Sequence, residues 1–253
     1  MKNTLKTVIV ILRYITFLTV LATGSLIVLA IPINALRLAF CKHAGKLIMW
    51  IFGITLIIRG ELPHNKQKVI VANHFGLIEI IAIMRLQGLR FVAQSGMSHY
   101  AFLGWAMRRT GQIFIDRKKT KSKQHLEEVL AVIKAGEDIA FFPEGRVNDS
   151  RSTLRFKSSL LNIVSDAYKP CDFTIVPLAI AYTGVNEKQR ELIHYHQESV
   201  LSYLYCICCV GKSNMVIEIL PEVEISGDGH DAKAITRHLE SIISKKFDVL
   251  LQE

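Results

Sequence analysis

The first 60 residues of this 253-residue chain contain no aspartate or glutamate; the first carboxylate is Glu61. Seven basic residues precede it: Lys2, Lys6, Arg13, Arg37, Lys42, Lys46 and Arg59. The net charge of the chain is +9, so these seven leave only +2 for the remainder. Basic residues on a hydrophobic segment favour an anionic membrane surface as partner. The basic clusters also lack the interleaved aromatic residues typical of nucleic-acid binding, so we expect no nucleic-acid partner.

Charge is also missing between Arg13 and Arg37. The apolar run Tyr14–Ile33 has 20 residues, about 30 Å as a helix, which is enough to cross a bilayer core. No A-x-A-like cleavage site follows it, which argues against a cleaved signal peptide. A second run, Leu47–Ile58, is too short to span and is expected to be interfacial, re-entrant or packed on the first. The sequence therefore predicts a membrane-anchoring helical segment over residues 1–60 and a separate domain over residues 61–253.

Cysteines are few and odd in number: Cys41, Cys171, Cys206, Cys208 and Cys209. The last three lie in the apolar run LYCICCV without C-x-x-C spacing, which predicts buried, reduced thiols in a cytosol-facing domain. His194-x-His196 lacks an evident third ligand, so no metal is expected. The sequence shows no cofactor motif, and we expect none to be required.

After Glu61, strand and helix patterns alternate. Strands are expected at 68–72, 90–93, 112–115, 139–142, 173–181 and 215–220, and helices at 77–86, 98–109, 121–135, 157–167 and 232–251. This alternation predicts an α/β domain with a largely parallel sheet flanked by helices. Pro177 inside the strand at 173–181 predicts a sheet edge or a bulge. The segment Thr183–Lys212 shows no regular pattern.

The stretch VIVANHFGLIEI, residues 69–80, ends a strand at His74 and places Glu79 just past a turn that Gly76 eases. A carboxylate on the Nδ1–H of a histidine holds its tautomer and stabilises the imidazolium, which leaves Nε2 to accept a proton from a hydroxyl. No convincing G-x-S-x-G nucleophile is present, so the attacking hydroxyl is expected to belong to the substrate. Taken alone, a His-x4-Glu spacing occurs by chance in many chains.

Four sequence blocks in order strengthen this interpretation. NHFGLIE is similar to an N-H-x4-D block, and FVAQSGMSHYAFLGWAMRRTGQIFIDR ends in G-x-x-F-x-x-R at Gly111, Phe114 and Arg117. FFPEGR, followed by FKSSL at 156–160, is similar to an F-P-E-G-T block, and IVPLAIAYT is similar to a V-P strand. Residues 68–225 thereby resemble the glycerolipid acyltransferase family, the 1-acylglycerol-3-phosphate acyltransferase-like enzymes.

The resemblance implies roles for seven residues. His74 would be the general base and Glu79 its partner, while Arg117 would bind the phosphate or other polar head of the acceptor. Glu144 and Gly145, with Arg146 beside them, would shape the acceptor site, and Pro177 would support the wall near the thioester. The alternatives from the residues alone are a solvated charge for Arg117 and a helix N-terminal acid for Glu144.

Two departures from the family pattern bear on specificity. The acid is Glu79 where the family has Asp, and Arg146-Val147 stand where it commonly has Thr-Arg. The resemblance implies a membrane-bound O-acyltransferase of phospholipid biosynthesis with its catalytic domain facing the cytosol, at the cytoplasmic membrane if bacterial. Its acceptor would be 1-acyl-sn-glycerol-3-phosphate or another lysolipid such as lyso-ornithine lipid, and its donor acyl-CoA or acyl carrier protein. An acyl-thioester hydrolase and a non-catalytic membrane scaffold with the same fold remain the alternatives.

Overall fold

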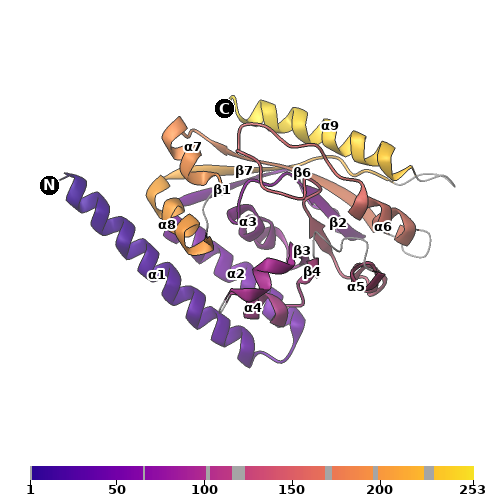
Figure 1. Cartoon of the computed structure of the whole chain (residues 1–253), viewed down its shortest axis with the longest axis horizontal. Helices are drawn as coiled ribbons and strands as arrows, with labels where there is room; N and C mark the ends of the chain where they lie inside the picture. The colour runs from indigo at the N-terminus through magenta and orange to yellow at the C-terminus, as the bar shows by residue number, and fades with distance from the viewer. Residues whose placement is uncertain are drawn as a thin grey trace.

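The computed structural model describes residues 2–64, 66–100, 103–115, 123–168, 173–195, 199–224 and 231–253. A seven-stranded sheet in the order β1-β7-β6-β2-β5-β3-β4 forms its centre (Figure 1). All neighbouring strands are parallel except β6 and β7. The strands are β1 (Ile54–Arg59), β2 (Gln67–Ala72), β3 (Arg90–Gln94), β4 (Ile113–Ile115), β5 (Ile139–Phe141), β6 (Phe173–Thr183) and β7 (Ser213–Ile219).

Helices cover both faces of the sheet. On one side lie α5 (Lys123–Lys134), α6 (Ser159–Tyr168) and α9 (Ala232–Leu250); on the other lie α2 (Asn34–Phe52) and α3 (Ile78–Leu86), with α4 (Leu103–Arg109), α8 (Val200–Val210) and α1 (Lys2–Ala30) outside them (Figure 1). A 3-10 turn (Ser95–His99) precedes α4, and α7 (Glu187–Ile193) precedes α8. The predicted α/β class with a largely parallel sheet is confirmed.

Most of the expected elements lie within a few residues of their predicted bounds. Apolar periodicity located them because the strands β2, β5 and β6 are almost wholly buried and the helices α5 and α9 each bury one stripe. The helix expected over 98–109 is divided instead, because a 3-10 turn ends at His99 and α4 begins only at Leu103. Residues 101–102 between them lie outside the described part of the chain.

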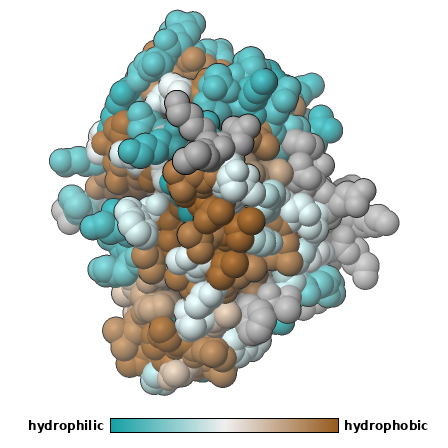
Figure 2. Space-filling model, turned by 90° about the vertical axis from the view of Figure 1, so that its left-hand side faces the viewer, coloured by the Kyte–Doolittle hydropathy of each residue, from teal (hydrophilic) through white to brown (hydrophobic). Residues whose placement is uncertain are grey.

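α1 is long and apolar enough to cross a membrane over Thr4–Ala30, so it begins well before the expected run Tyr14–Ile33 and includes Lys6 and Arg13. Its inner stripe is buried at Phe17, Ser25 and Val28 against the rest of the protein. Its outer side exposes Leu5, Val8, Ile9, Ile11, Leu12, Ile15, Leu26, Ile27 and Leu29. Figure 2 shows the side of the molecule on which α1 begins, with apolar residues over its middle and lower parts and hydrophilic residues over its top. Such a helix suggests membrane association.

Arg37 fixes this helix to the domain. Its side chain is buried, and its Nε and Nη2 donate to the carbonyls of Ile31 and Pro32 where α1 ends, at 2.7 Å each. Its Nη1 donates to the carbonyl of Arg109 at the end of α4, at 3.0 Å. α1 also runs beside α8 and α4 along the domain rather than away from it (Figure 1). The helix and the α/β domain are therefore packed as one structure.

The second apolar run, Leu47–Ile58, was expected to be interfacial, re-entrant or packed on the first helix. Its first part ends α2, where Phe52 packs on Phe17 of α1 with ring centroids 5.0 Å apart, so the third alternative holds there. Its second part forms β1, which pairs in parallel with β7 along its whole length and was not expected. The mostly apolar stretch ITLII fits a strand as well as a membrane contact, and the sequence did not distinguish them. The domain boundary proposed at residue 60 falls after this strand, so residues 54–59 belong to the sheet.

The segment Thr183–Lys212, which showed no sequence pattern, contains α7 and α8. α8 carries Cys206, Cys208 and Cys209, and the described cysteines are free thiols. Only Cys208 among them is buried, whereas Cys209 is exposed. The expectation of buried thiols was thus wrong for Cys209, because the apolar run is a helix with one face packed on the domain and another outside.

Pro177 lies in a central strand, so the expected sheet edge was wrong. β6 is bordered by β2 and β7, and the amide that follows β7 donates to the Pro177 carbonyl at 3.0 Å. The carbonyl and the missing N–H of one residue face the same side of a strand. On that side the register passes from Leu178↔Ile219 to Ile175↔Val223, which inserts one extra residue opposite Pro177. This bulge in the segment after β7 explains why the missing N–H donor of Pro177 is tolerated.

Candidate active site

The candidate site lies at the carboxyl end of β2, where side chains of adjacent strands and loops converge. Asn73, the residue after this strand, is buried and pairs with Ile180 of β6 through both ends of its amide: Nδ2 donates to the Ile180 carbonyl and Oδ1 accepts from its N–H, each at 2.8 Å. These two hydrogen bonds to a neighbouring strand fix the direction in which the chain leaves β2. They thereby also fix the position of the His74 backbone, which follows directly.

His74 and Glu79 are in contact, as the sequence predicts. Nδ1 of His74 lies 2.8 Å from Oε1 of Glu79, and the same oxygen accepts the N–H groups of Phe75 and Gly76 at 2.6 Å each. Glu79 is fully buried in the first turn of α3, while the side chain of His74 is 17% exposed. The imidazole stacks on Phe142 with ring centroids 4.1 Å apart. Three donors on one carboxylate oxygen therefore fix both the loop and the ring.

This pairing determines which imidazole nitrogen is available. Because Oε1 of an ionised carboxylate can only accept, Nδ1 must donate to it, and Nε2 is left as the acceptor in the neutral ring. Within the described ranges no residue is hydrogen-bonded to Nε2. The arrangement provides a base whose tautomer is set by its neighbour, which suits it to take a proton from a hydroxyl group.

Gly76 was expected to ease the turn, but the structure shows that it is needed because a side chain there would meet Tyr203. Its backbone is not in the left-handed region that would need glycine. A Cβ there would instead overlap the hydroxyl oxygen of Tyr203 and lie 2.9 Å from its Cζ. Tyr203 is fully buried on α8, and its hydroxyl accepts the N–H of Leu77 at 3.4 Å. Burial and the nearby Glu79 carboxylate raise the pKa of Tyr203, so it stays neutral beneath the loop.

Glu144 supports the same loop from the other side. Its Oε1 accepts the backbone N–H of His74 at 2.8 Å, and its Oε2 accepts that of Leu154 at 2.8 Å. Asn148 donates to both oxygens through Nδ2, and its backbone N–H donates to the carbonyl of His74 at 2.7 Å. Burial raises the pKa of Glu144 to about 7, against these N–H donors, which lower it. The glutamate is therefore a brace for the backbone of His74, with both of its oxygens occupied.

The remaining predicted residues are placed differently. Gly145 turns the chain with a φ of 68°, beside the side chain of Lys157, and Arg146 after it is exposed. Pro177 is buried in β6 next to Val71 of β2, two residues before Asn73. Arg117 lies outside the described residues, as does all of 116–122. The structure thus brings together His74, Glu79 and Glu144, and places Gly145 and Arg146 on the turn that follows Glu144.

Three further residues of the site were given no role by sequence reasoning. Phe142 was recognised only as part of a strand and of the F-P-E-G block, and Asn148 lies four residues after Glu144 in a stretch without a pattern. Tyr203 lies in the segment whose structure could not be predicted, 129 residues from His74 in the chain. Only packing shows that these side chains meet the loop.

Comparison with known proteins fits this geometry. The Acyltransferase family model matches residues 54–181, about half of the chain, from β1 to β6. The chain belongs to this acyltransferase family. The predicted resemblance is thereby confirmed, and the matched range begins at β1 and includes the whole His74–Glu79 loop.

Several named members of the acyltransferase family align with the chain. A lyso-ornithine lipid O-acyltransferase of Rhizobium meliloti is 26% identical over 149 residues, covering 57% of this chain and 51% of the relative. A 1-acyl-sn-glycerol-3-phosphate acyltransferase of Limnanthes douglasii is 27% identical over 177 residues, covering 67% and 62%. The chain thus spans about half the length of the lyso-ornithine lipid relative that it matches.

The fold is also that of a solved acyltransferase. The crystal structure of the 1-acyl-sn-glycerophosphate acyltransferase PlsC from Thermotoga maritima superposes with a TM-score of 0.73, covering 99% of this chain and 98% of the other. The sequence identity is 16%, so this match shows the fold alone. Because it covers nearly the full chain, the likeness includes the N-terminal helices as well as the sheet.

Proposed function

We propose that this protein transfers a fatty acyl group from a thioester donor to the free hydroxyl of a lysolipid, with His74 as the general base. The observation that carries the proposal is the 2.8 Å contact between Nδ1 of His74 and Oε1 of a fully buried Glu79. That contact sets the tautomer in which Nε2 accepts a proton. Family membership supplies the reaction class, and the relatives named above supply the candidate acceptors.

The reaction balances with these two residues and both substrates. Nε2 of His74 removes the proton of the lysolipid hydroxyl as its oxygen attacks the thioester carbonyl carbon. The C–S bond then breaks, the ester remains on the lipid, and the imidazolium returns the proton to the departing thiolate. Glu79 stabilises the imidazolium between these steps because its charge lies at hydrogen-bond distance.

The acceptor that we favour is 1-acyl-sn-glycerol-3-phosphate, which would give phosphatidic acid. Lyso-ornithine lipid is the second candidate, because relatives of that name align with the chain. Acyl-CoA or acyl carrier protein would supply the acyl group. Glu79 in place of the family's Asp is compatible with the role, since it reaches Nδ1 and two backbone N–H groups together.

An assay of the full chain in detergent or vesicles separates the candidates. Labelled acyl-CoA or labelled acyl carrier protein is supplied with 1-acyl-sn-glycerol-3-phosphate, with lyso-ornithine lipid, or without acceptor. A labelled lipid that forms only with one acceptor supports the transferase and names that acceptor. Free fatty acid formed equally without acceptor would indicate an acyl-thioester hydrolase. Neither product from folded protein with either donor type would indicate a non-catalytic scaffold.

Arg117 is proposed to bind the polar head of the acceptor. Arg117→Ala is expected to raise the acceptor KM about 10- to 100-fold and to change the donor KM little, because a charge-assisted contact contributes about 1.5–3 kcal/mol. Lys118→Ala, a change of one neighbouring charge, is the control. Steady-state kinetics with each substrate varied in turn would measure the two KM values. An unchanged acceptor KM would support the alternative that Arg117 is a solvated surface charge.

The membrane is proposed to be engaged by the outer face of α1, with the catalytic domain on the cytosolic side. Ile15 and Leu26 of that face are 55% and 57% exposed, so changing both to glutamate leaves the packed stripe intact. We expect this double variant to lose most of its association with vesicles, since each charge must be kept out of the hydrocarbon region.

Flotation of the full chain with vesicles in high salt measures this association. The matched control is Ala234→Glu with Val249→Glu, which adds the same charges to exposed positions of α9 on the other side of the protein (Figure 1). Unchanged flotation of the α1 variant would show that another surface holds the protein. Point changes are preferable to a truncation at residue 60, which would also remove β1 from the sheet.

A further inference from the structure

A groove separate from the His74 loop lies between α1 and the β1 side of the sheet. Its volume is about 730 Å³, and it is bounded by α1, the end of α2 and the starts of β1 and β7. The end of β6 closes it at Thr183 and Gly184. The groove therefore lies along the same edge of the sheet as His74 but over other strands, since β6 and β2 are neighbours and β1 is the edge strand.

The wall of this groove combines apolar and cationic groups. Ile9 and Leu12 of α1 and Trp50 of α2 line it and are 42%, 57% and 74% exposed. They continue the apolar outer face of α1. Arg13 and Lys212 also line it, and none of its lining residues is acidic. An amphiphile with an anionic head and a hydrocarbon tail matches this combination.

Arg13 is held in place without a counter-ion. It is half-buried, and a Cβ at Gly53 would lie 3.1 and 3.4 Å from its two terminal nitrogens, so the guanidinium rests on the backbone where α2 ends. Among the described residues it has no ion pair. The nearby thiol of Cys208 is neutral, because burial raises its pKa to about 12. A half-buried cation with no partner favours an anion from outside the chain.

Ser213 adds a second, independent observation. It lines the groove, is 7% exposed, and its hydroxyl oxygen has no hydrogen-bond partner in the described part of the protein. A buried hydroxyl without a partner costs free energy that a ligand oxygen would recover. Lys212 beside it is exposed and forms no described ion pair. Two cations and a free hydroxyl thus converge on one groove.

We propose that this groove binds the phosphate of an anionic phospholipid from the bilayer, with Arg13 and Lys212 as ligands, Ser213 as a hydrogen-bond donor, and the acyl chains along Ile9, Leu12 and Trp50. The site is continuous with the apolar outer face of α1, which is proposed above to contact the bilayer. It does not depend on the acyltransferase reaction, because it uses neither His74 nor Glu79. Its effect would be to select membranes rich in anionic lipid.

Fluorescence of Trp50 tests the site. The chain has two tryptophans, so Trp105→Phe leaves Trp50 as the reporter. The full-length protein is placed in phosphatidylcholine vesicles with equal fractions of brominated phosphatidylglycerol or brominated phosphatidylcholine. We expect Trp50 to be quenched preferentially by the anionic lipid, with each cation contributing about a fivefold preference. Arg13→Gln with Lys212→Gln should abolish the preference, and Lys212→Gln alone, at an exposed position, should reduce it about fivefold.

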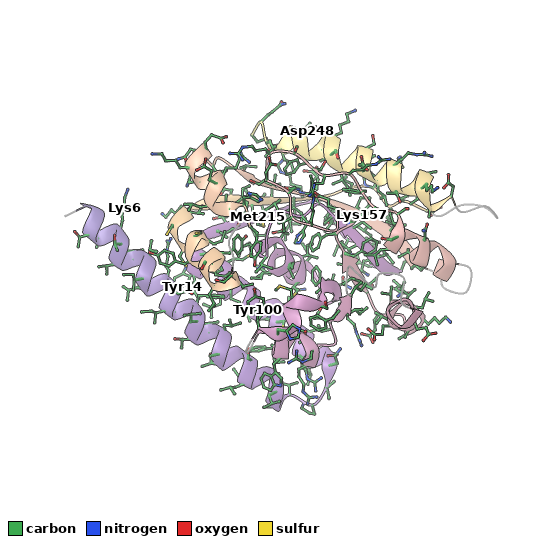
Figure 3. All side chains as sticks on the ribbon, viewed as in Figure 1. Lys6, Tyr14, Tyr100, Lys157, Met215 and Asp248 are labelled. Carbon is green, nitrogen blue, oxygen red and sulfur yellow. The ribbon has the colours of Figure 1, made fainter. Side chains whose placement is uncertain are left out.

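The control removes two exposed cations from α1 and α2, the helices that border the groove. Lys6→Gln with Lys42→Gln changes residues outside the groove, and Lys6 lies toward the free end of α1 (Figure 3). Equal quenching by both lipids, or an equal loss of preference in this control, would overturn the proposal. Free CoA is added as a competitor in a separate arm. If it removes the preference in the parent protein, the groove binds phosphates of the thioester donor instead and the lipid assignment is wrong.

Discussion

His74→Ala is expected to lower kcat by about 10²–10⁴, the usual contribution of a positioned general base. The variant should remain folded, because His74 is partly exposed and the hydrogen bonds that hold the loop do not need its side chain: Asn73 bonds to Ile180, Glu144 accepts the backbone N–H of residue 74, and Glu79 accepts that of Phe75. Product formation from labelled acyl-CoA under saturating substrates measures the loss. Activity close to that of the parent protein would show that another group takes the proton.

Changes at Glu79 test whether the pair acts as a unit. Glu79→Gln keeps an oxygen for the N–H groups of Phe75 and Gly76 but removes the charge that stabilises the imidazolium, so it should also cost heavily. Glu79→Asp keeps the charge on a shorter side chain and should retain more activity than the glutamine variant. The double variant at 74 and 79 should lose about as much as His74→Ala alone, since residues that act together are non-additive.

Independent losses that add in the double variant would contradict the pairing, as would normal turnover in Glu79→Gln. The comparison of kcat with KM provides a second readout. A merely structural glutamate would lower the amount of folded enzyme without changing kcat per folded molecule. A partner of His74 should lower kcat per folded molecule and change the KM of either substrate little.

Gly76→Ala is expected to abolish most activity and to destabilise the protein by roughly 1–3 kcal/mol, the usual cost of overpacking. The new methyl would overlap the hydroxyl of Tyr203, which is fully buried and cannot move outward. The loop that carries His74 must then shift, and small displacements of a catalytic group cost much of its effect. Thermal unfolding in detergent and kcat are measured together.

Gly96→Ala is the matched control, because no atom lies within 4 Å of a Cβ at that position. Combining Gly76→Ala with Tyr203→Phe removes the overlapping oxygen and should restore part of both stability and activity. It should not restore all of it, since the new methyl would still lie 2.9 Å from Cζ. Full activity in Gly76→Ala alone would show that the loop tolerates displacement and that Tyr203 does not position it.

Local chemistry together with the family resemblance predicted the centre of the candidate site. The His74–Glu79 pair is separated by only four residues at the end of a buried strand, so a short loop is sufficient to bring the two groups together. Glu144 was also predictable, because it follows another parallel strand, β5, whose carboxyl end lies beside that of β2. Periodicity likewise determined the α/β class, since buried strands and amphipathic helices have different apolar spacing.

Long-range packing decided the rest. Leu47–Ile58 is apolar enough for a membrane contact, and only pairing with β7 makes part of it an edge strand. Pro177 reads as an edge residue, and only the extra residue in the chain opposite allows it inside the sheet. Tyr203 and Arg13 have no local signal for their neighbours Gly76 and Gly53. The spacing of apolar residues indicates which side chains are buried on folding. It does not indicate which distant segment covers them, because the hydrophobic effect is non-directional and any apolar surface of suitable shape can bury them. Only the tertiary structure decides that.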